Sequence, residues 1–285
     1  MSRTDLRAKA ERLLALHVPG SPLVLVNVWD AATARMVGQA GASALATTSA
    51  GIAFAQGYPD GEVISRAEML EAVAVIARAV ELPVSADMEA GYGGRLEDAA
   101  ETAAGVLAAG AVGLNLEDCR ADGSLFAVDE AIARIRAVRE AGARAGVALV
   151  LNARTDVFIR AVGEPQARLG HAITRGRAYL EAGADCAFVP SVNDAPTIEA
   201  LVRGIGGPVN VLSAPGGPSI AELAELGVAR VSVGSAAYRA ALAVTERIAR
   251  EAYGAGSLAL LHGEQFGFAD AQTLMEQPAP GESRV

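Results

Sequence analysis

Lysine, histidine and cysteine are scarce in this sequence of 285 residues. Lys9 is the only lysine, and the other 23 basic residues are arginines. A Schiff-base aldolase needs a desolvated lysine in its active site, and Lys9 lies in the leading segment, where it is poorly placed to supply one. His17, His171 and His262 all fall outside the predicted strand ends. Their positions argue against a histidine zinc site and against a Ser-His-Asp triad.

Net positive charge and long apolar runs are also missing. The formal net charge is −9 and no basic cluster is visible, which argues against a nucleic-acid or anionic-membrane surface. No stretch approaches the roughly 20 apolar residues that span a bilayer. Residues 1–20 carry charges throughout and predict an amphipathic helix over about 3–17, not a signal peptide. With two cysteines, Cys119 and Cys186, we expect a reduced, cytoplasmic protein and a buried position for Cys186.

Eight short, apolar and β-branched runs alternate with longer segments of helical period. The predicted strands are 23–28, 44–49, 83–89, 112–117, 148–154, 186–190, 209–213 and 230–234. The predicted helices between and after them are 31–40, 66–80, 95–109, 128–145, 167–182, 195–203, 219–226 and 236–250. This alternation predicts an α/β fold, a (β/α)8 TIM-type barrel with an extra N-terminal helix that closes its bottom. An open, doubly wound sheet is the weaker alternative, because no glycine fingerprint follows the first strand.

The end of the chain differs from the rest. Residues 1–253 predict a single barrel domain, whereas residues 254–285 predict a C-terminal helical extension with a polar tail. The apolar stretch "SLALLHGEQFGF" within this extension favours a contact with a partner subunit. We therefore expect a homo-oligomer, a dimer or a tetramer.

Polar side chains gather at the predicted strand ends, which is where barrel enzymes place their chemistry. Asp87 and Glu89 share one face of a strand by its period of two, as do Asn115 with Glu117 and Asn152 with Arg154. Like charges held together are costly unless a cation or a shared proton lies between them. At these strand ends three carboxylates stand against one arginine. This excess of carboxylates predicts a hard divalent cation, Mg²⁺ with Mn²⁺ as a substitute, and an anionic substrate held by Arg154. The alternative is a buried ion-pair network at the barrel mouth.

Three further segments are candidates for binding or catalysis. The long loop after the second strand offers backbone amides at Ala50 and Gly51 to a carboxylate or an oxyanion, although such a loop can also be a plain lid. Cys119 follows the acids of the fourth strand and is a candidate reactive thiol. "SAPGG" and "VGS", after the seventh and eighth strands, lie where barrels often bind phosphate, so a phosphate-bearing ligand is a rival hypothesis.

The motifs "TSAG…GYPDG", "DMEAGYGG", "LED" and "LNARTD", in this order and at these strand ends, resemble the isocitrate lyase / phosphoenolpyruvate mutase superfamily, in particular its small 2-methylisocitrate lyase and phosphonomutase branch. The resemblance covers roughly residues 8–250. It implies a Mg²⁺-dependent barrel enzyme that makes or breaks C–C or C–P bonds of small 2-oxo or 2-hydroxy acids through an enolate-type intermediate.

The resemblance also implies roles for individual residues. Metal binding would fall to Asp87, Glu89 and Glu117; substrate binding to Ser49, Ala50, Gly51, Asp87 and Arg154; and catalysis to Asp60, Glu117 and Arg154. Cys119 is a further catalytic candidate by its position alone, since it stands too close to Glu117 to match the cysteine of the lyases. The segment "LEDCRADGSLFAVDEA" departs from the family, because it lacks the Cys-Gly-His loop of the lyases and the Lys and Asn of the mutases.

These departures leave three hypotheses for the function. The first is a Mg²⁺-dependent carbon–carbon lyase or decarboxylase for isocitrate, 2-methylisocitrate or oxaloacetate; decarboxylation demands least of the missing loop. The second is a C–P enzyme, a phosphonopyruvate hydrolase or a phosphoenolpyruvate mutase. The third is a 2-oxo-acid binding protein that has lost catalysis.

Overall fold

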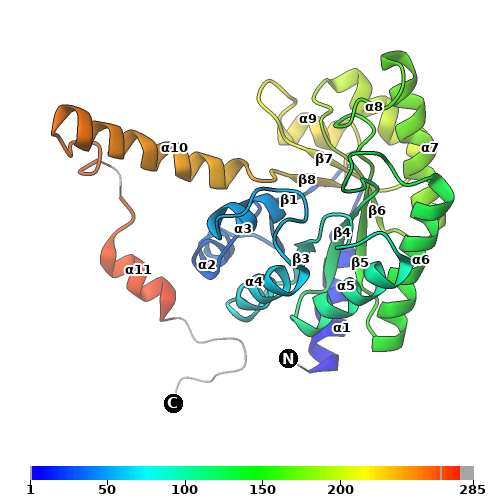
Figure 1. Cartoon of the computed structure of the whole chain (residues 1–285), viewed down its shortest axis with the longest axis horizontal. Coiled ribbons are helices and arrows are strands. Elements are labelled where there is room, and N and C mark those ends of the chain that lie inside the picture. The colour runs from blue at the N-terminus through cyan, green and yellow to red at the C-terminus, as the bar shows by residue number, and fades with distance from the viewer. Residues whose placement is uncertain (1, 264, 277–285) are drawn as a thin grey trace.

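The computed structural model describes residues 2–263 and 265–276, in which eight parallel strands form a nearly closed barrel (Figure 1). The hydrogen-bonded order is β1-β8-β7-β6-β5-β4-β3-β2. The ring closes between β1 and β2 through a single parallel bridge, in which the Val28 N–H donates to Ala46 O at 2.8 Å and the Thr48 N–H donates to Val28 O at 3.1 Å. The strands are β1 (Leu23–Leu25), β2 (Leu45–Ala46), β3 (Val84–Asp87), β4 (Gly113–Glu117), β5 (Val150–Arg154), β6 (Cys186–Val189), β7 (Val209–Leu212) and β8 (Arg230–Ser232).

The helices start and stop at the sequence signals expected of them. Ser65 with Glu68, and Ser219 with Glu222, form capping boxes, and Gly146 ends a helix in the left-handed conformation. The helices are α1 (Arg3–Ala15), α2 (Ala31–Gln39), α3 (Ser49–Ala55), α4 (Arg66–Arg78), α5 (Leu96–Ala108), α6 (Val128–Ala145), α7 (Arg168–Glu181), α8 (Ala195–Ile205), α9 (Ile220–Glu225), α10 (Ala236–Arg250) and α11 (Phe268–Met275), with a 3₁₀ turn at Pro165–Ala167 and a π-helical turn at Glu251–Ala255.

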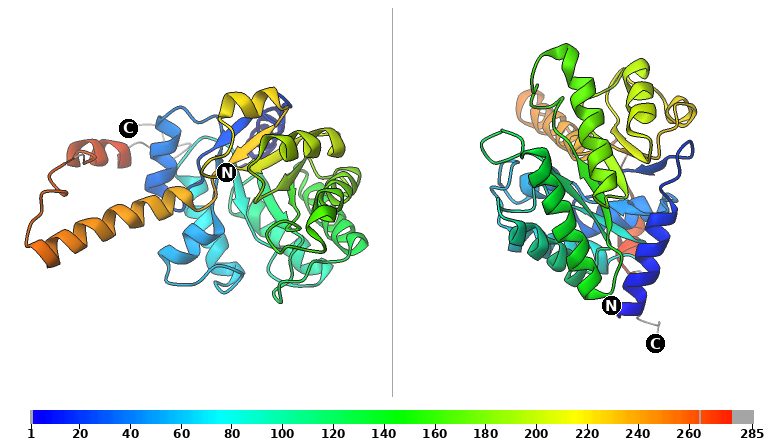
Figure 2. Two further views of the ribbon diagram at one scale, coloured as in Figure 1. Left: turned by 90° about the horizontal axis from the view of Figure 1, so that it is seen from above. Right: turned by 90° about the vertical axis from the view of Figure 1, so that its right-hand side faces the viewer.

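The predicted barrel is confirmed, and two of its helical segments differ from the expectation. The loop expected after the second strand begins with the short helix α3, which the Thr48 side chain caps by accepting from the Gly51 N–H at 3.2 Å. The last predicted helix forms over the expected residues, but α10 projects away from the barrel and does not cover it (Figures 1 and 2). Local sequence determines where a helix forms, whereas its direction depends on packing partners. In the described part of the chain, no helix is long and apolar enough to cross a membrane.

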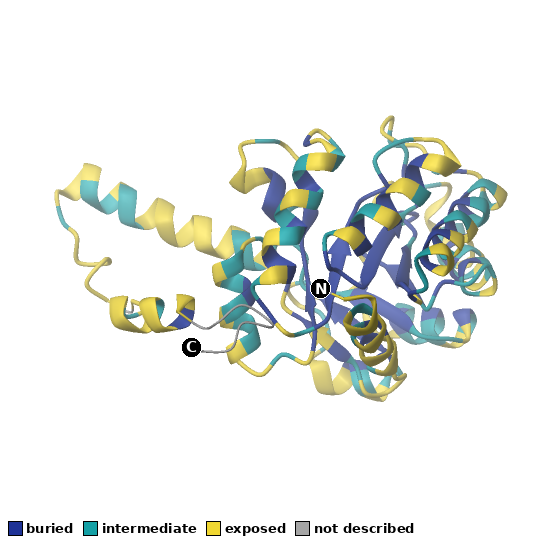
Figure 3. Cartoon of the chain, turned by 90° about the horizontal axis from the view of Figure 1, so that it is seen from below, coloured by how far each residue is buried: buried dark blue, intermediate teal, exposed yellow. Residues whose placement is uncertain are grey.

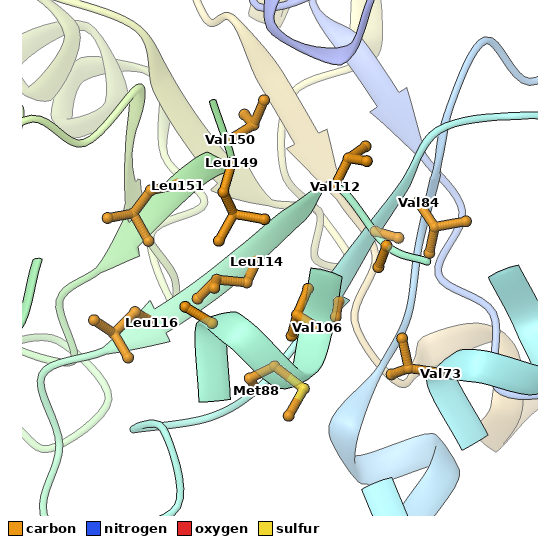
Figure 4. Packing of buried hydrophobic residues seen from close by; sticks show 14 of the residues in the cluster. Val73, Val84, Met88, Val106, Val112, Leu114, Leu116, Leu149, Val150 and Leu151 are labelled. Carbon is orange, nitrogen blue, oxygen red and sulfur yellow. The ribbon is translucent and has the colours of Figure 1, made fainter. Parts of the chain in front are cut away.

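The core lies mainly between the strands and the surrounding helices. Figure 4 shows Val84, Leu114 and Leu151 of neighbouring strands beside Val106 of α5 and Val73 of α4. Helix α1 closes the bottom of the barrel, as predicted. Its Leu13 is fully buried, and a Cβ atom added to Gly113 at the start of β4 would lie only 2.8 Å from Leu13 Cδ2. A side chain at position 113 would therefore displace the end of Leu13 and would also lie 3.1 Å from the Val150 carbonyl oxygen.

His17, just after α1, gives the fold a pH dependence. Its Nδ1 is bonded to Leu13 O at 2.9 Å, and burial, together with the nearby Arg230 charge, lowers the pKa of His17 to about 4. In the unfolded chain His17 is protonated below about pH 6.5, whereas in the folded chain it stays neutral down to about pH 4. The neutral, buried His17 therefore contributes to the free energy of unfolding above pH 6.5, and this contribution is lost as the pH falls toward 4. Between pH 7 and pH 5 we expect His17→Gln to lose about 2 kcal/mol less unfolding free energy than the parent protein, as measured by urea titration. If both proteins lose the same unfolding free energy between pH 7 and pH 5, the pH dependence does not come from His17.

Candidate active site

Asp87 ends β3 and is held on both carboxylate oxygens. Its Oδ2 accepts from the Ser49 N–H at 3.0 Å and from Ser49 Oγ at 2.9 Å, and its Oδ1 accepts from Asn115 Nδ2 at 3.1 Å. The Asp87 N–H donates to Thr47 Oγ1 at 2.8 Å. The side chain is only 9% exposed. These donors fix the orientation of the buried carboxylate.

Glu89 lies near Asp87 for a different reason from the predicted one. The strand ends at Asp87, and Glu89 adopts a left-handed turn conformation with φ of 49°. The expected shared strand face is therefore wrong, since strand alternation stops before Glu89. Burial, reinforced by the charges of Asp60, Asp87 and Glu62, raises the pKa of Glu89 to about 8. Its buried Oε1 has no hydrogen-bond partner among the described residues.

Glu117 and Arg154 face each other at the ends of β4 and β5, as the strand register Glu117↔Arg154 requires. Arg154 Nη1 donates to Glu117 Oε1, and Nε donates to Asp156 Oδ1 at 2.6 Å. Arg154 Nη2 also donates to Asp156 Oδ2, at 3.1 Å. Burial raises the pKa of Glu117 well above its usual range, while the Arg154 charge opposes this shift. Among the described residues, three of the five guanidinium N–H groups have an acceptor, and two remain for a ligand.

The predicted substrate-binding residues occupy the first turn of α3. Ser49 directs both its N–H and its Oγ to Asp87, and the Gly51 N–H donates to Thr48 Oγ1. The Ala50 N–H is left without an acceptor among the residues that the structure describes. Asp60 lies on the loop between α3 and α4, at the rim of the site. Partial burial and the Asp87 charge raise the pKa of Asp60.

The side chains of the two residues after Glu117 bond to groups outside this set of acids. Asp118 is buried, and its Oδ2 accepts from Tyr179 Oη at 2.6 Å and from Arg175 Nη1 at 3.0 Å, so it joins β4 to α7. Cys119 is also buried, and its Sγ donates to Arg120 O at 3.4 Å. Burial raises the pKa of Cys119, which keeps the thiol protonated. A protonated thiol suits a proton donor and not an activated nucleophile.

Two residues missed by the sequence reasoning hold the loop that carries Glu89. The Tyr92 N–H donates to Glu62 Oε1 at 2.7 Å. Arg134 of α6 is buried and binds three backbone carbonyls of this loop: Ala90 O, Gly93 O at 2.9 Å and Arg95 O at 2.8 Å. Glu62 directly follows the "GYPDG" motif and could have been suspected from it. Nothing in the sequence pointed to a role for Arg134, since an arginine on a helix is ordinarily exposed.

We expect Arg134→Met to lower the free energy of unfolding by about 3 kcal/mol, because three buried carbonyls lose their donor. The substitution should also weaken any function that depends on the position of Glu89. Arg136→Met, an exposed position on the same helix, is the matched control and should stay within about 0.5 kcal/mol of the parent protein. Urea unfolding measures both, and equal stabilities of the two variants would show that the Arg134 contacts contribute little.

The loops after β6 and β7 enclose a surface depression of about 410 Å³, which includes Gly216 and Gly217 of the "SAPGG" segment. Asp194 and Glu222 also line it, and each of them caps a helix. Two carboxylates make this depression a poor place for a phosphate group.

The acids at the barrel mouth suit a cation that is bound in part through water. Within residues 2–263 and 265–276, no group of three or more His, Cys, Asp and Glu side chains is close enough to hold an ion directly. Mg²⁺ commonly keeps several waters and uses only one or two carboxylates. The unpartnered Glu89 Oε1 and the acid excess over Arg154 fit such an ion.

Residues 13–253 match the family model described as phosphoenolpyruvate phosphomutase. An oxaloacetate decarboxylase of Ectopseudomonas mendocina is 34% identical over 209 residues, which cover 70% of this chain and 68% of the decarboxylase. An uncharacterised protein of Mycobacterium tuberculosis H37Rv is 37% identical over 235 residues, 82% of this chain and 86% of its own length.

Among solved structures, a Burkholderia cenocepacia J2315 protein provisionally described as a phosphonomutase superposes with a TM-score of 0.81. It is 48% identical, and the match covers 85% of this chain and 99% of the other. The family match extends over the whole barrel and includes every strand end described above. This chain therefore belongs to the phosphoenolpyruvate phosphomutase family.

Proposed function

We propose that the protein is a Mg²⁺-dependent carbon–carbon bond lyase or decarboxylase for a small 2-oxo or 2-hydroxy di- or tricarboxylate of the isocitrate, 2-methylisocitrate or oxaloacetate class. The observation that carries the proposal is the group of buried carboxylates at one end of the barrel, with Arg154 among them and one unpartnered oxygen on Glu89. The kinship with an oxaloacetate decarboxylase supports C–C chemistry.

In this proposal Asp87 anchors the metal, and Glu89 and Glu117 hold its water ligands. Bound Mg²⁺, or Mn²⁺ in its place, would supply positive charge where the substrate oxygen becomes negative. Arg154 binds a substrate carboxylate through its two remaining N–H groups. The first turn of α3, Ser49 to Gly51, orients the 2-oxo group, with the Ala50 N–H as its free donor.

Two further residues complete the proposal. Asp60, at the rim of the site, orients the bound acid. Cys119 is the candidate proton donor, because burial keeps its thiol neutral; to act, the Sγ–H would turn from Arg120 O toward the substrate. Both thiols of the chain, Cys119 and Cys186, are unpaired in the structure, in keeping with the reduced cytoplasmic setting that we propose.

A direct test uses NMR with a mixture of isocitrate, 2-methylisocitrate, oxaloacetate and phosphonopyruvate, with Mg²⁺ and again with EDTA. Loss of a C–C substrate only with Mg²⁺, faster than in Mg²⁺ without protein, is the expected result. Loss of phosphonopyruvate alone would favour the C–P alternative, which the kinship with the protein described as a phosphonomutase keeps open. If all four compounds persist but one raises the melting temperature, the binding-protein hypothesis would replace the lyase.

We also propose that the chain forms a homo-oligomer, a dimer or a tetramer, through a C-terminal arm made of α10, the π-helical turn and α11. None of the residues of α10 is buried, and Leu242 and Val244 are almost half exposed (Figure 3). Val24 of β1 and Val26 just after it are about 40% exposed. Apolar side chains left uncovered on the arm and on the barrel favour a second copy of the chain as their cover. We keep the predicted division of the chain into a barrel domain, residues 1–253, and a C-terminal extension, residues 254–285. Of this extension, residues 277–285 lie outside the described part of the chain.

We expect light scattering to give a multiple of the chain mass of 29.0 kDa for the parent protein. The double substitution Leu242→Asp and Val244→Asp should yield a folded monomer, since neither side chain supports the core of its own subunit. Arg136→Asp, an exposed change on α6, is the control and should leave the mass unchanged. A parent protein of monomer mass at micromolar concentration would rule the oligomer out.

A further inference from the structure

The interior of this barrel is polar at the level below the carboxylates. Barrel interiors are usually filled by branched apolar side chains. Here Asn115 of β4, Asn152 of β5, Asn210 of β7 and Ser232 of β8 are buried, and Arg230 of β8 is fully buried with them. No described acid pairs with Arg230, and its Nε and Nη1 atoms have no hydrogen-bond partner. Buried charge is costly unless it is compensated, so this guanidinium calls for an explanation.

One bond of Arg230 passes across the barrel. Its Nη2 donates to Asn115 Oδ1 at 3.3 Å. Arg230 is on β8 and Asn115 on β4, which lie four positions apart in the ring of eight strands, so the bond must cross the interior. The pKa of Arg230 is lowered by burial to about 10, so the side chain still carries its charge at pH 7.

The bond ends on an amide that contacts Asp87. Asn115 Oδ1 accepts from Asn152 Nδ2 at 2.7 Å as well as from Arg230, and Asn115 Nδ2 donates to Asp87 Oδ1 at 3.1 Å. Two donors on Oδ1 determine which end of the amide faces each neighbour. With the opposite orientation, the carbonyl of Asn115 would lie against the Asp87 carboxylate and its NH₂ group against the guanidinium. Both contacts would be repulsive.

We propose that Arg230 is a positioning residue for the metal site: through Asn115, it orients the carboxylate of Asp87. The inference rests on the proposed metal role of Asp87. Arg230 could act on the metal site by orienting Asp87 or through its own positive charge, and the two predict opposite effects of an Arg230 substitution on cation affinity. Loss of orientation should weaken cation binding, whereas loss of a nearby positive charge by itself should strengthen it.

The test measures Mn²⁺ binding to the metal-stripped, full-length protein by electron paramagnetic resonance, without substrate. Arg230→Met should raise the dissociation constant about tenfold, and Asn115→Leu should raise it by a similar factor. The double variant should lose little more than either single variant, because the two residues act through one path. Asn210→Leu is the matched control, since Asn210 is a fully buried interior asparagine that bonds Ser232 at 3.1 Å and lies outside this path. It should stay within about twofold of the parent protein.

The melting temperature separates positioning from folding. Arg230→Met replaces an unpaired buried charge by an apolar chain of similar length, so the metal-free variant should melt no lower than the parent protein. Arg230→Gln keeps an N–H donor without the charge and should recover part of the Mn²⁺ affinity. Unchanged or tighter Mn²⁺ binding by Arg230→Met, or fully additive losses in the double variant, would overturn the inference alone. A parent protein that binds no Mn²⁺ would overturn the proposed function, and the inference with it.

Discussion

Replacing Asp87 by asparagine is expected to lower kcat/KM with the preferred acid by at least about 10³-fold and to abolish the response to Mg²⁺. The substitution preserves the shape of the side chain but removes the charge of an acid that is held on both oxygens. An amide also presents an NH₂ group, which would face either the donors of Ser49 or the donor of Asn115. A loss of about 10³-fold corresponds to ~4 kcal/mol of transition-state stabilisation.

The matching effect on stability should be smaller. One buried donor left without an acceptor costs about 1–3 kcal/mol, so urea unfolding should find Asp87→Asn folded at 25 °C. Asp129→Asn, an exposed aspartate in the first turn of α6, is the control for the change of charge and should retain full activity. If Asp87→Asn retains Mg²⁺-dependent turnover within tenfold of the parent protein, then Asp87 does not anchor the metal.

Replacing Arg154 should have the second largest effect. Arg154→Met leaves the buried Glu117 and Asp156 carboxylates without their shared partner. Breaking a buried ion pair from one side costs about 3–5 kcal/mol, so this variant should be strongly destabilised. Arg154→Lys keeps the charge and should fold. A single ammonium cannot serve Glu117, Asp156 and a substrate carboxylate together, so we expect KM to rise about 10- to 100-fold.

Steady-state kinetics of Arg154→Lys, with melting temperature as the measure of folding, tests this expectation. Arg203→Met removes an exposed arginine that pairs only with Glu199 on the same helix, and it should change neither KM nor stability. A folded Arg154→Lys variant with unchanged KM would show that Arg154 serves the ion-pair network and does not bind the substrate.

Much of the site could be predicted because its signals are local. Asp87, Glu117 and Arg154 each end a strand whose apolar run is visible in the sequence, and in a parallel barrel such ends meet at one rim. Glu89 was predicted to lie near Asp87 from strand alternation, yet the chain turns after Asp87 and brings Glu89 there through a left-handed conformation. The glycines of "EAGYGG" indicated a turn, but not where it begins.

The sequence by itself determined the eight strands, the helices between them and the acids at their ends, because period, capping and turn chemistry act over a few residues. Only the tertiary structure decided which distant residues meet. The Arg134 contacts with the Glu89 loop and the Arg230 bond to Asn115 join residues 39 or more positions apart, and no local pattern encodes such contacts. The direction of α10 also depended on packing, since the local sequence of a helix does not specify the surface that it packs against.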